Sequence, residues 1–421
     1  MKLQKIVNRL LRLHPKEIDL SLDRILSLCK KLGNPQDKIK AISVVGTNGK
    51  QSTINAIFAI LNEAKIKCNV YTSPHIQRIN ERFIFNNKEL SDVELAELFE
   101  KVEKINNNEP ITFFEILTAC YFYEAAKYPK NINIIEAGLF HRFDATNILK
   151  TNLASIVCSC SIDHIDWLPE NERTIEKIVF EKTSSLLESK IVVSRQNSKQ
   201  TLECIKKTIL KNSSNKLFFN EDFSFSYEEN DFFYYEDKFG GLKLPMPNVL
   251  GQFQLDNIST AIATIRLLNF NLKDEHIKKG ITKIKSIARL QEIRSGKLKD
   301  LVKYNRLLLD GSHNEDGSRV LNEYLDTLDC KKHVIIGMMA NKDHKKYISY
   351  FKNISSLTTI NIPNQPNAID GKKLKEKFSN VPNVKFKESI EDALKSLSLK
   401  ENDLIIITGS LYLGGEFLNL N

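Results

Sequence analysis

The stretch VVGTNGKQST, residues 44–53, combines the residue types of a phosphate-binding loop. A short apolar run ends in two glycines, and a helical pattern starts directly after the lysine. A turn of this kind points backbone N–H groups and the positive end of a helix dipole at one place, which attracts phosphate. Lys50 can then reach the outer phosphates of a nucleotide, and the hydroxyl of Ser52 or Thr53 can coordinate magnesium.

The spacing within this loop leaves an alternative open. The commonest phosphate loop separates its glycines more widely and carries a hydroxyl directly after the lysine, where this chain has Gln51. An ordinary strand-to-helix turn explains the stretch equally well. We expect a nucleotide to be bound by the residues of this loop, which are Gly46, Thr47, Asn48, Gly49, Lys50, Gln51 and Ser52.

Two further apolar runs end in groups suited to a divalent metal. Glu136 closes the run IIE, and Asp163 and His164 follow the next run, SIVCSCSI. The carboxyl ends of strands in an open α/β sheet form the edge that binds ligands. Because Mg²⁺ prefers oxygen ligands, a histidine that serves only its own loop is the alternative for His164.

A similar arrangement occurs in the last third of the chain. The run LLLD delivers Asp310 to the end of a strand, and a tight turn with His313 and Asn314 follows. A helix-capping and turn role explains Asp310 and Asn314 equally well.

These groups need elements that hold them, and the apolar pattern predicts an α/β chain. Short apolar runs alternate with helical patterns, as in a parallel sheet with connecting helices. We expect strands at 42–45, 131–138 and 154–161, and helices at 51–64, 93–105 (with Ser91 and Glu94 as a capping box), 113–128 and 255–268. Aromatic and polar residues alternate over 217–245, which indicates a small antiparallel sheet.

The alternation of strands and helices restarts after a basic segment near 285–300, which we interpret as a linker. The predicted fold is therefore a P-loop-type doubly wound sheet domain with a small antiparallel sheet, followed by a smaller Rossmann-like α/β domain. We place the domains at 1–287 and 288–421.

Composition excludes several classes of protein. The 421 residues include seven scattered cysteines without a Cys-x-x-Cys pair, which argues against a disulfide framework or a zinc site. No apolar run approaches the roughly 18 residues of a membrane span, and we expect a cytoplasmic protein that does not bind membranes. The net charge of +9 favours anionic partners, but acids interleave with the lysines, so we expect no nucleic-acid site.

Many motifs, taken together and in order, resemble the folylpolyglutamate synthase and dihydrofolate synthase family, the folate branch of the Mur ligase superfamily. The matching stretches run nearly end to end: LHPKEIDLSLDR, LGNP, GTNGK, YTSPHIQRINER, TFFE, EAGLFHRFDATN, DHIDWL, LGQFQLDN, ARLQ, LDGSHN, GMMANKD and ITGSLYLGGE. The resemblance implies a nucleotide-binding domain and a Rossmann-like domain with the active site between them. It also implies ATP-dependent addition of L-glutamate to dihydropteroate, to folate or its polyglutamates, or to both, through an acyl phosphate.

The resemblance assigns roles to individual positions. Lys50 would bind the β- and γ-phosphates, and Ser73, Glu136 and His164 would hold magnesium, with two ions expected. Lys182 stands where family members carry a lysine carbamylated by CO₂, and we count it with Lys50 and His164 as catalytic.

Two further groups follow from the same resemblance. Nucleotide contacts from the rest of the chain are expected at Asn257, Arg289, Asp310 and His313. The pterin-bearing substrate is expected to lie near Thr72, Pro74, His75, Arg82, Phe113 and Phe114.

Departures from the family pattern keep alternatives open. Gln51 replaces a glycine, Phe140 and His141 replace a glycine pair, and Pro169 follows Leu168 where a glycine is usual. These changes predict a narrowed or altered acceptor specificity. The alternatives are a catalytically silent nucleotide- or folate-binding paralogue, and a Mur-type ligase with another acceptor. We expect a monomer whose partners are ATP, L-glutamate and dihydropteroate or folate.

Overall fold

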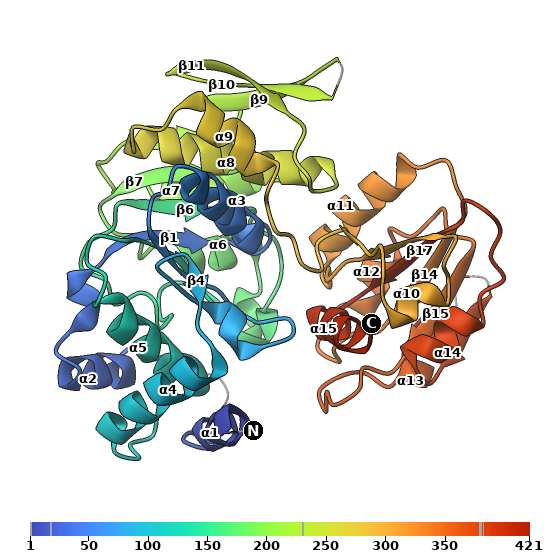
Figure 1. The fold of residues 1–421 in the computed structure, drawn as a ribbon, viewed down its shortest axis with the longest axis horizontal. Helices are drawn as coiled ribbons and strands as arrows, with labels where there is room; N and C mark the ends of the chain where they lie inside the picture. Colours follow the sequence, from blue (N-terminus) through green and yellow to red (C-terminus); the bar gives the residue numbers. More distant parts are fainter. Residues whose placement is uncertain (1, 17–18, 230, 379–380, 382) are drawn as a thin grey trace. The chain divides into compact units, whose positions relative to one another are not determined.

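The computed structural model describes residues 2–16, 19–229, 231–378, 381 and 383–421 (Figure 1). The chain forms two compact units, Met1–Asn248 with Leu255–Ile284 and Val249–Gln254 with Lys285–Asn421. Within the predicted motif LHPKEIDLSLDR, residues 17 and 18 lie outside the described residues. A domain boundary at 287/288 stays our proposal.

The first unit is built on an eight-stranded sheet with the order β4-β3-β2-β5-β1-β6-β7-β8. Its strands are β1 (Lys40–Val45), β2 (Cys68–Tyr71), β3 (Phe83–Phe85), β4 (Lys88–Glu89), β5 (Ile132–Glu136), β6 (Ala154–Val157), β7 (Lys190–Val193) and β8 (Lys216–Phe218). All pairings are parallel except those of β2 with β3 and β3 with β4. The chain runs first to one side of β1 and then to the other, so the end of β1 is a topological switch point.

The helices of the first unit include the four that were predicted, which are α3, α4, α5 and α8. They are α1 (Lys2–Leu10), α2 (Asp23–Lys31), α3 (Lys50–Glu63), α4 (Asp92–Asn106), α5 (Phe113–Ala125), α6 (Ile175–Thr183), α7 (Lys199–Thr208), α8 (Gln252–Leu268) and α9 (Asp274–Ile281). Short 3-10 turns lie at Pro35–Lys38, Ile79–Arg82, Ile165–Trp167 and Glu170–Glu172. The predicted capping box is confirmed, because Ser91 accepts from Glu94 N and Glu94 accepts from Ser91 N.

A separate three-stranded antiparallel sheet, β11-β10-β9, confirms the prediction for the aromatic-rich region. Its strands are β9 (Phe223–Glu228), β10 (Phe232–Asp237) and β11 (Gly240–Pro245). Arg266 of α8 joins this sheet through the Gly240 carbonyl at 2.8 Å and the Asp237 carboxylate at 3.0 Å. Residues 217 and 218, at the start of the predicted region, belong to the large sheet instead, because they lie in β8, which pairs in parallel with β7.

The second unit contains a six-stranded sheet with the order β12-β13-β17-β14-β15-β16. The strands are β12 (Gln291–Glu292), β13 (Arg306–Leu309), β14 (Lys332–Ile336), β15 (Ser356–Ile360), β16 (Val384–Lys387) and β17 (Leu404–Thr408). The helices are α10 (Lys297–Asp300), α11 (Glu315–Asp326), α12 (His344–Ile348), α13 (Gly371–Lys377), α14 (Ile390–Lys395) and α15 (Leu411–Leu420). Only β12 pairs antiparallel in this described sheet.

The prediction that 285–300 is a linker is wrong. This segment contributes β12 and α10 to the second unit, and β12 pairs with Leu308 and Leu309 of β13. Ile293 and Leu298 are buried although most residues around them are charged or polar. The density of basic residues therefore reflects a solvated face of folded structure.

No helix among the described residues is long and apolar enough to cross a lipid bilayer.

Candidate functional site

The loop between β1 and α3 is held against the residues that follow β6. The backbone N–H groups of Thr47 and Asn48 both donate to the Ser159 carbonyl, at 2.7 and 3.1 Å. The Thr47 hydroxyl donates to the Ser161 carbonyl at 3.1 Å, and Ser161 N donates back to that hydroxyl at 3.0 Å. The loop is thus fixed in shape by its own backbone and by the neighbouring strand end.

Both glycines of the loop are required by geometry. Gly46 has φ +144°, and a Cβ there would lie 2.8 Å from the Cys158 Cβ. Gly49 has φ +86°, and a Cβ there would collide with the Asn257 side-chain oxygen. Asn257 of α8 therefore lies directly over the loop, beside the residues predicted to bind the nucleotide.

The first turn of α3 carries the remaining loop residues. Ser52 and Thr53 are buried, and Gln51 is partly exposed. The thiol of Cys158 lies 3.5 Å from the Thr53 hydroxyl. Nothing in the structure explains the glutamine at position 51.

Two lysines reach the same carbonyl oxygen of the loop. Lys50 Nζ donates to Gly46 O at 3.2 Å, and Lys182 Nζ donates to Gly46 O at 3.1 Å and to Leu139 O at 2.8 Å. Lys182 comes from α6 and is buried. Burial, and then the positive charge of Lys50, lower the pKa of Lys182 to about 8. Cationic groups thus concentrate at the start of the loop.

A carboxylate from the adjacent strand β5 approaches this point. Glu136 is buried, and its Oε2 accepts from Ser73 N, which follows β2, at 3.0 Å. Its Oε1 lies 3.8 Å from Lys50 Nζ. The structure therefore brings together Lys50, Ser73 and Glu136, three of the predicted residues, at one edge of the sheet.

His164 lies past the end of β6, on the other side of β1. It has φ +58°, its backbone N–H donates to Asp163 Oδ1 at 2.8 Å, and its Nε2 lies 4.0 Å from Asp163 Oδ2. In the described part of the chain, no three His, Cys, Asp or Glu side chains form a cluster that could hold a metal. The set of Ser73, Glu136 and His164 stays a prediction as a metal site.

The residues predicted to face the acceptor form two contacts. His75 Nδ1 accepts from Arg82 Nε at 2.9 Å, and burial together with the Arg82 charge lowers the pKa of His75 to about 4. The Thr72 hydroxyl donates to Glu81 O at 3.4 Å, whereas Pro74 is exposed. His75 is therefore a neutral hydrogen-bond acceptor for Arg82 near neutral pH.

Phe113 and Phe114 form the first turn of α5 and are partly buried. The Phe114 ring stacks on Tyr71 of β2 with centroids 6.0 Å apart. A Cβ at Gly138, in the loop after β5, would come within 3.1 Å of the same ring. Phe114 thus lies between two of the strand ends that carry predicted site residues.

Phe140 and His141, which replace the family's glycines, pack inward. Phe140 is buried with Leu168 and Ile178, and its ring centroid lies 5.4 Å from Lys182 Nζ. His141 Nδ1 lies 2.9 Å from the Ser185 hydroxyl, and burial lowers its pKa to about 4. Their effect on acceptor specificity stays a prediction.

In the second unit, the structure brings together Arg289, Asp310 and His313. Asp310 accepts from Leu290 N and Ser312 N, both at 2.9 Å, and His313 Nδ1 lies 3.0 Å from Gly311 O. The Arg289 guanidinium lies near the Gly311 backbone, because a Cβ on Gly311 would be 3.2 Å from its NH1.

Sequence reasoning missed two ion pairs beside predicted site residues of the first unit. Arg142 binds Glu181 through two bonds, at 2.8 and 2.7 Å, directly before Lys182. Arg24 binds Glu115 at 3.0 Å, directly after Phe114. The spacing of Thr112 and Glu115 is a capping box and was detectable, whereas the arginine partners are distant in sequence.

Comparisons with known proteins find similar chains and a matching domain family. The family model for the Mur ligase, glutamate ligase domain matches residues 294–411. The dihydrofolate synthase/folylpolyglutamate synthase of Haemophilus influenzae is 29% identical over 429 residues, which cover 96% of this chain and 94% of the relative.

Solved structures share the fold along nearly the whole chain. Escherichia coli FolC in complex with DHPP and ADP is 25% identical, with a TM-score of 0.86 over 99% of this chain and 97% of that one. The bifunctional folylpolyglutamate synthase/dihydrofolate synthase of Yersinia pestis, complexed with AMPPNP and Mn ion, shares the fold at 24% identity, with a TM-score of 0.86 over 99% of this chain and 97% of that one. The loop and the sheet edge thus occur in a chain that is similar, over nearly its whole length, to folylpolyglutamate synthases/dihydrofolate synthases, and that matches the Mur ligase, glutamate ligase domain over residues 294–411.

Proposed function

We propose that the protein is an ATP-dependent ligase that joins L-glutamate to dihydropteroate, to folate or its polyglutamates, or to both, through an acyl phosphate. The observation that carries this proposal is the convergence of Lys50, Lys182 and Glu136 on the loop after β1. The Lys50 cation at a glycine-rich helix start suits the phosphates of a nucleoside triphosphate, and the Glu136 carboxylate suits its metal.

The chemistry follows from the charge of the acceptor. A carboxylate resists attack by an amine, because it is already negative and would have to expel oxide. Transfer of the γ-phosphoryl group gives an acyl phosphate, from which inorganic phosphate leaves when the glutamate amine attacks. In phosphoryl transfer the protein contributes mainly position and neutralisation of charge.

Within this chain, Lys50 and the amides of residues 46–52 would bind the β- and γ-phosphates. Lys50 now donates to Gly46 O and Thr47 O at 3.2 Å each, so its ammonium group already lies over the loop. Asn257 lies against Gly49 and is proposed to contact the nucleotide. Arg289, Asp310 and His313 of the second unit are proposed as further nucleotide contacts.

Magnesium fits the residues at the end of β5. Glu136 is a buried carboxylate beside a hydroxyl residue, Ser73, and oxygen donors are the ligands that Mg²⁺ prefers. We propose Ser73, Glu136 and His164 as the metal-binding set, for two ions in all. The metal would neutralise charge on the phosphates. A relative binds AMPPNP with a Mn ion.

Carbamylation of Lys182 fits one property of this residue. CO₂ reacts with an uncharged amine, and a pKa of about 8 makes that form accessible near neutral pH. A carbamate keeps a single N–H, so one of the two bonds to Gly46 O and Leu139 O would be given up. We propose this modification, and we expect that short carboxylic acids restore part of the activity of Lys182→Ala.

The acceptor is proposed to lie near Phe113, Phe114 and the pair formed by His75 and Arg82, with Thr72 and Pro74 beside them. The buried guanidinium of Arg82 suits a substrate that carries carboxylates. An adjacent neutral histidine leaves that positive charge undiminished.

The proposal is tested by phosphate release from ATP with purified protein at saturating L-glutamate. We expect release to require an acceptor, and the rates with dihydropteroate and tetrahydrofolate define which acceptor is used. Nucleotide binding without release, with every acceptor supplied, would identify a silent paralogue. Size-exclusion chromatography and cell fractionation test the monomeric state and cytoplasmic location that belong to the proposal.

A further inference from the structure

The start of α5 is stabilised by a buried carboxylate. Glu115 Oε2 accepts from Thr112 N at 2.7 Å, and Glu115 N donates to the Thr112 hydroxyl at 3.3 Å. Phe113 and Phe114 lie between these two residues, so the capping box fixes their backbone. Glu115 Oε1 is buried and has no hydrogen-bond partner among the described residues.

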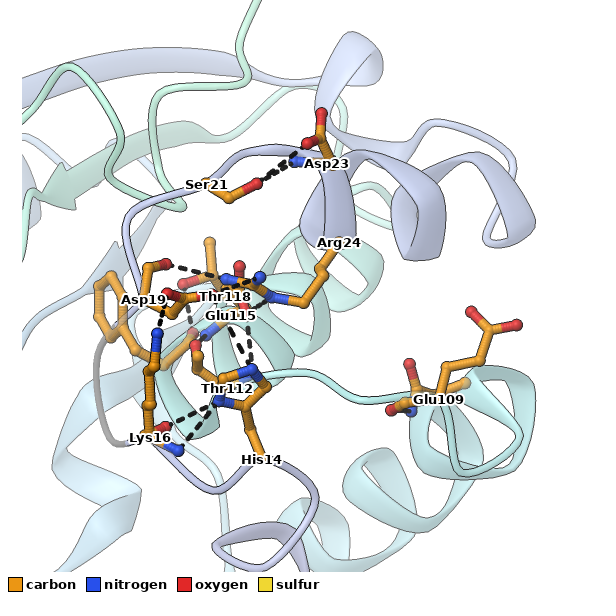
Figure 2. Close-up of polar contacts among 12 residues, drawn as sticks. His14, Lys16, Asp19, Ser21, Asp23, Arg24, Glu109, Thr112, Glu115 and Thr118 are labelled. Atoms are coloured by element: carbon orange, nitrogen blue, oxygen red, sulfur yellow. Dashed lines mark hydrogen bonds and ion pairs between the residues drawn. The ribbon is translucent and has the colours of Figure 1, made fainter.

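Arg24 supplies a positive charge to this carboxylate. Its Nε donates to Glu115 Oε2 at 3.0 Å. Its NH1 and NH2 donate to the side chain and the carbonyl of Asp19, both at 2.8 Å. Figure 2 shows the Arg24 side chain between Asp19 and Glu115, with Thr112 beside Glu115. The guanidinium therefore joins α2 and the segment before it to the first turn of α5.

The other side of the same turn is also held. The Thr118 hydroxyl donates to Phe114 O at 2.8 Å and lies 3.1 Å from the Tyr71 hydroxyl. Phe114 is thus held on one side through Thr118 and Tyr71, and on the other through Glu115. A shift of the capping box would move both phenylalanines, because they are its central residues.

We propose that Arg24 is a positioning residue for the acceptor substrate, which fixes Phe113 and Phe114 by holding the Glu115 carboxylate at the start of α5. This proposal rests on the proposed function, in which these two rings face the acceptor. Arg24 acts through Glu115. It therefore affects binding of the acceptor more than the transfer of phosphate from ATP.

The test compares Arg24→Ala and Arg24→Lys with wild type in the phosphate-release assay. We expect Arg24→Ala to raise the KM for the acceptor about tenfold or more, with the KM for ATP and kcat nearly unchanged. Arg24→Lys keeps a positive charge for Glu115 but cannot also form the two bonds to Asp19. Its KM for the acceptor should therefore lie between those of wild type and Arg24→Ala. Should Arg24→Ala fail to fold in a thermal unfolding check, the intermediate KM of Arg24→Lys decides.

The matched control is Arg9→Ala. Arg9 binds Glu103 with two bonds of 2.5 Å and joins α1 to α4 in the same unit. Its loss should leave the acceptor KM unchanged. Equal rises in Arg9→Ala and Arg24→Ala, or an acceptor KM in Arg24→Ala that matches wild type, would overturn the proposal.

Calorimetric titration with dihydropteroate separates this inference from the proposed function. If wild type binds dihydropteroate but releases no phosphate, the proposed function fails, and weaker binding by Arg24→Ala still supports the positioning role. Equal binding by both proteins overturns that role alone. Absence of binding by wild type overturns both.

Discussion

Two strand-to-helix turns, one in each unit, use their polar groups differently. Gly46–Lys50 follows β1 and leads into α3, and Asp310–Asn314 follows β13 and leads into α11. Asn314 caps α11 by accepting from Gly317 N at 2.8 Å. The N-cap residue of α3 is Gly49, which has no side chain to accept a bond from the first turn of that helix.

This difference indicates at which of the two turns a bound anion would add most to the stability of the helix start. In the second turn, both Asp310 oxygens and the Asn314 side chain are engaged with backbone N–H groups of their own unit. In the first turn, the N-cap residue is a glycine without a side-chain cap, and the helix start lies beside two lysines. An anion would complete the first turn, whereas the second is already complete and can serve as a rigid support for His313.

The largest effect should come from Lys50→Ala. Loss of the cation proposed to face the transferred phosphoryl group should lower acceptor-dependent phosphate release by about a thousandfold or more. The control is Lys283→Ala, which removes an exposed lysine that contacts α3 through Glu63. Lys50→Ala with near wild-type turnover would contradict the role of the first turn.

Gly49→Ala should be the next most damaging change. Alanine is strained at φ +86°, and its Cβ would collide with Asn257. We expect about tenfold weaker binding of ATP or more, measured by calorimetry. Asn257→Ala removes the collision but also a proposed nucleotide contact, so Gly49→Ala should weaken ATP binding less in an Asn257→Ala background than in wild type. Wild-type affinity in Gly49→Ala would show that the nucleotide binds elsewhere.

Lys182 should make the stability contributed by the first turn depend on pH. Its pKa is about 8 in the folded protein and has the ordinary lysine value of 10.5 in the unfolded chain, so the unfolded chain binds more protons between these values. Wild type should therefore gain stability relative to Lys182→Met as pH rises from about 8 to about 10.5. Denaturant unfolding at several pH values measures this gain. A stability difference between the two proteins that stays constant with pH would show that folding does not lower the pKa of this amine.

The smallest effect is expected in the second turn. Asn314→Ala removes a helix cap and should cost about 1 kcal/mol of unfolding free energy, measured by denaturant titration. Binding of ATP should change little, because the cap serves α11 itself. Loss of nucleotide affinity as large as that of Gly49→Ala would erase the distinction between the turns.

Local chemistry made much of the fold predictable from the sequence. The capping box of Ser91 and Glu94, the continuously apolar central strands and the helix at 113–125 each carry their signal within a few residues. Edge strands such as β12 and β16 are short and polar, so their pairing depends on neighbours that are distant in sequence. The error at 285–300 has the same cause, because charge density gives no information about the buried Leu298.

The candidate site was predictable where its residues follow strands directly. Glu136 and Lys50 come together because parallel strands end at one edge, whereas Ser73 beside them was expected only from the family resemblance. Contacts such as Lys182 to Gly46 and Arg24 to Glu115 join residues far apart in the chain, and no local pattern encodes them. The direction of the Phe140 and His141 side chains was not predictable either. They pack against α6 and its C-terminal end.

Transfer of an oxygen atom tests the central claim most directly. If the acceptor is activated as an acyl phosphate, one oxygen of its carboxylate must leave with inorganic phosphate when glutamate attacks. Dihydropteroate or folate labelled with ¹⁸O in that carboxylate is incubated with the protein, ATP and L-glutamate, and the phosphate is analysed by mass spectrometry. We expect one labelled oxygen in each phosphate released. Unlabelled phosphate, formed while amide product accumulates, would contradict it.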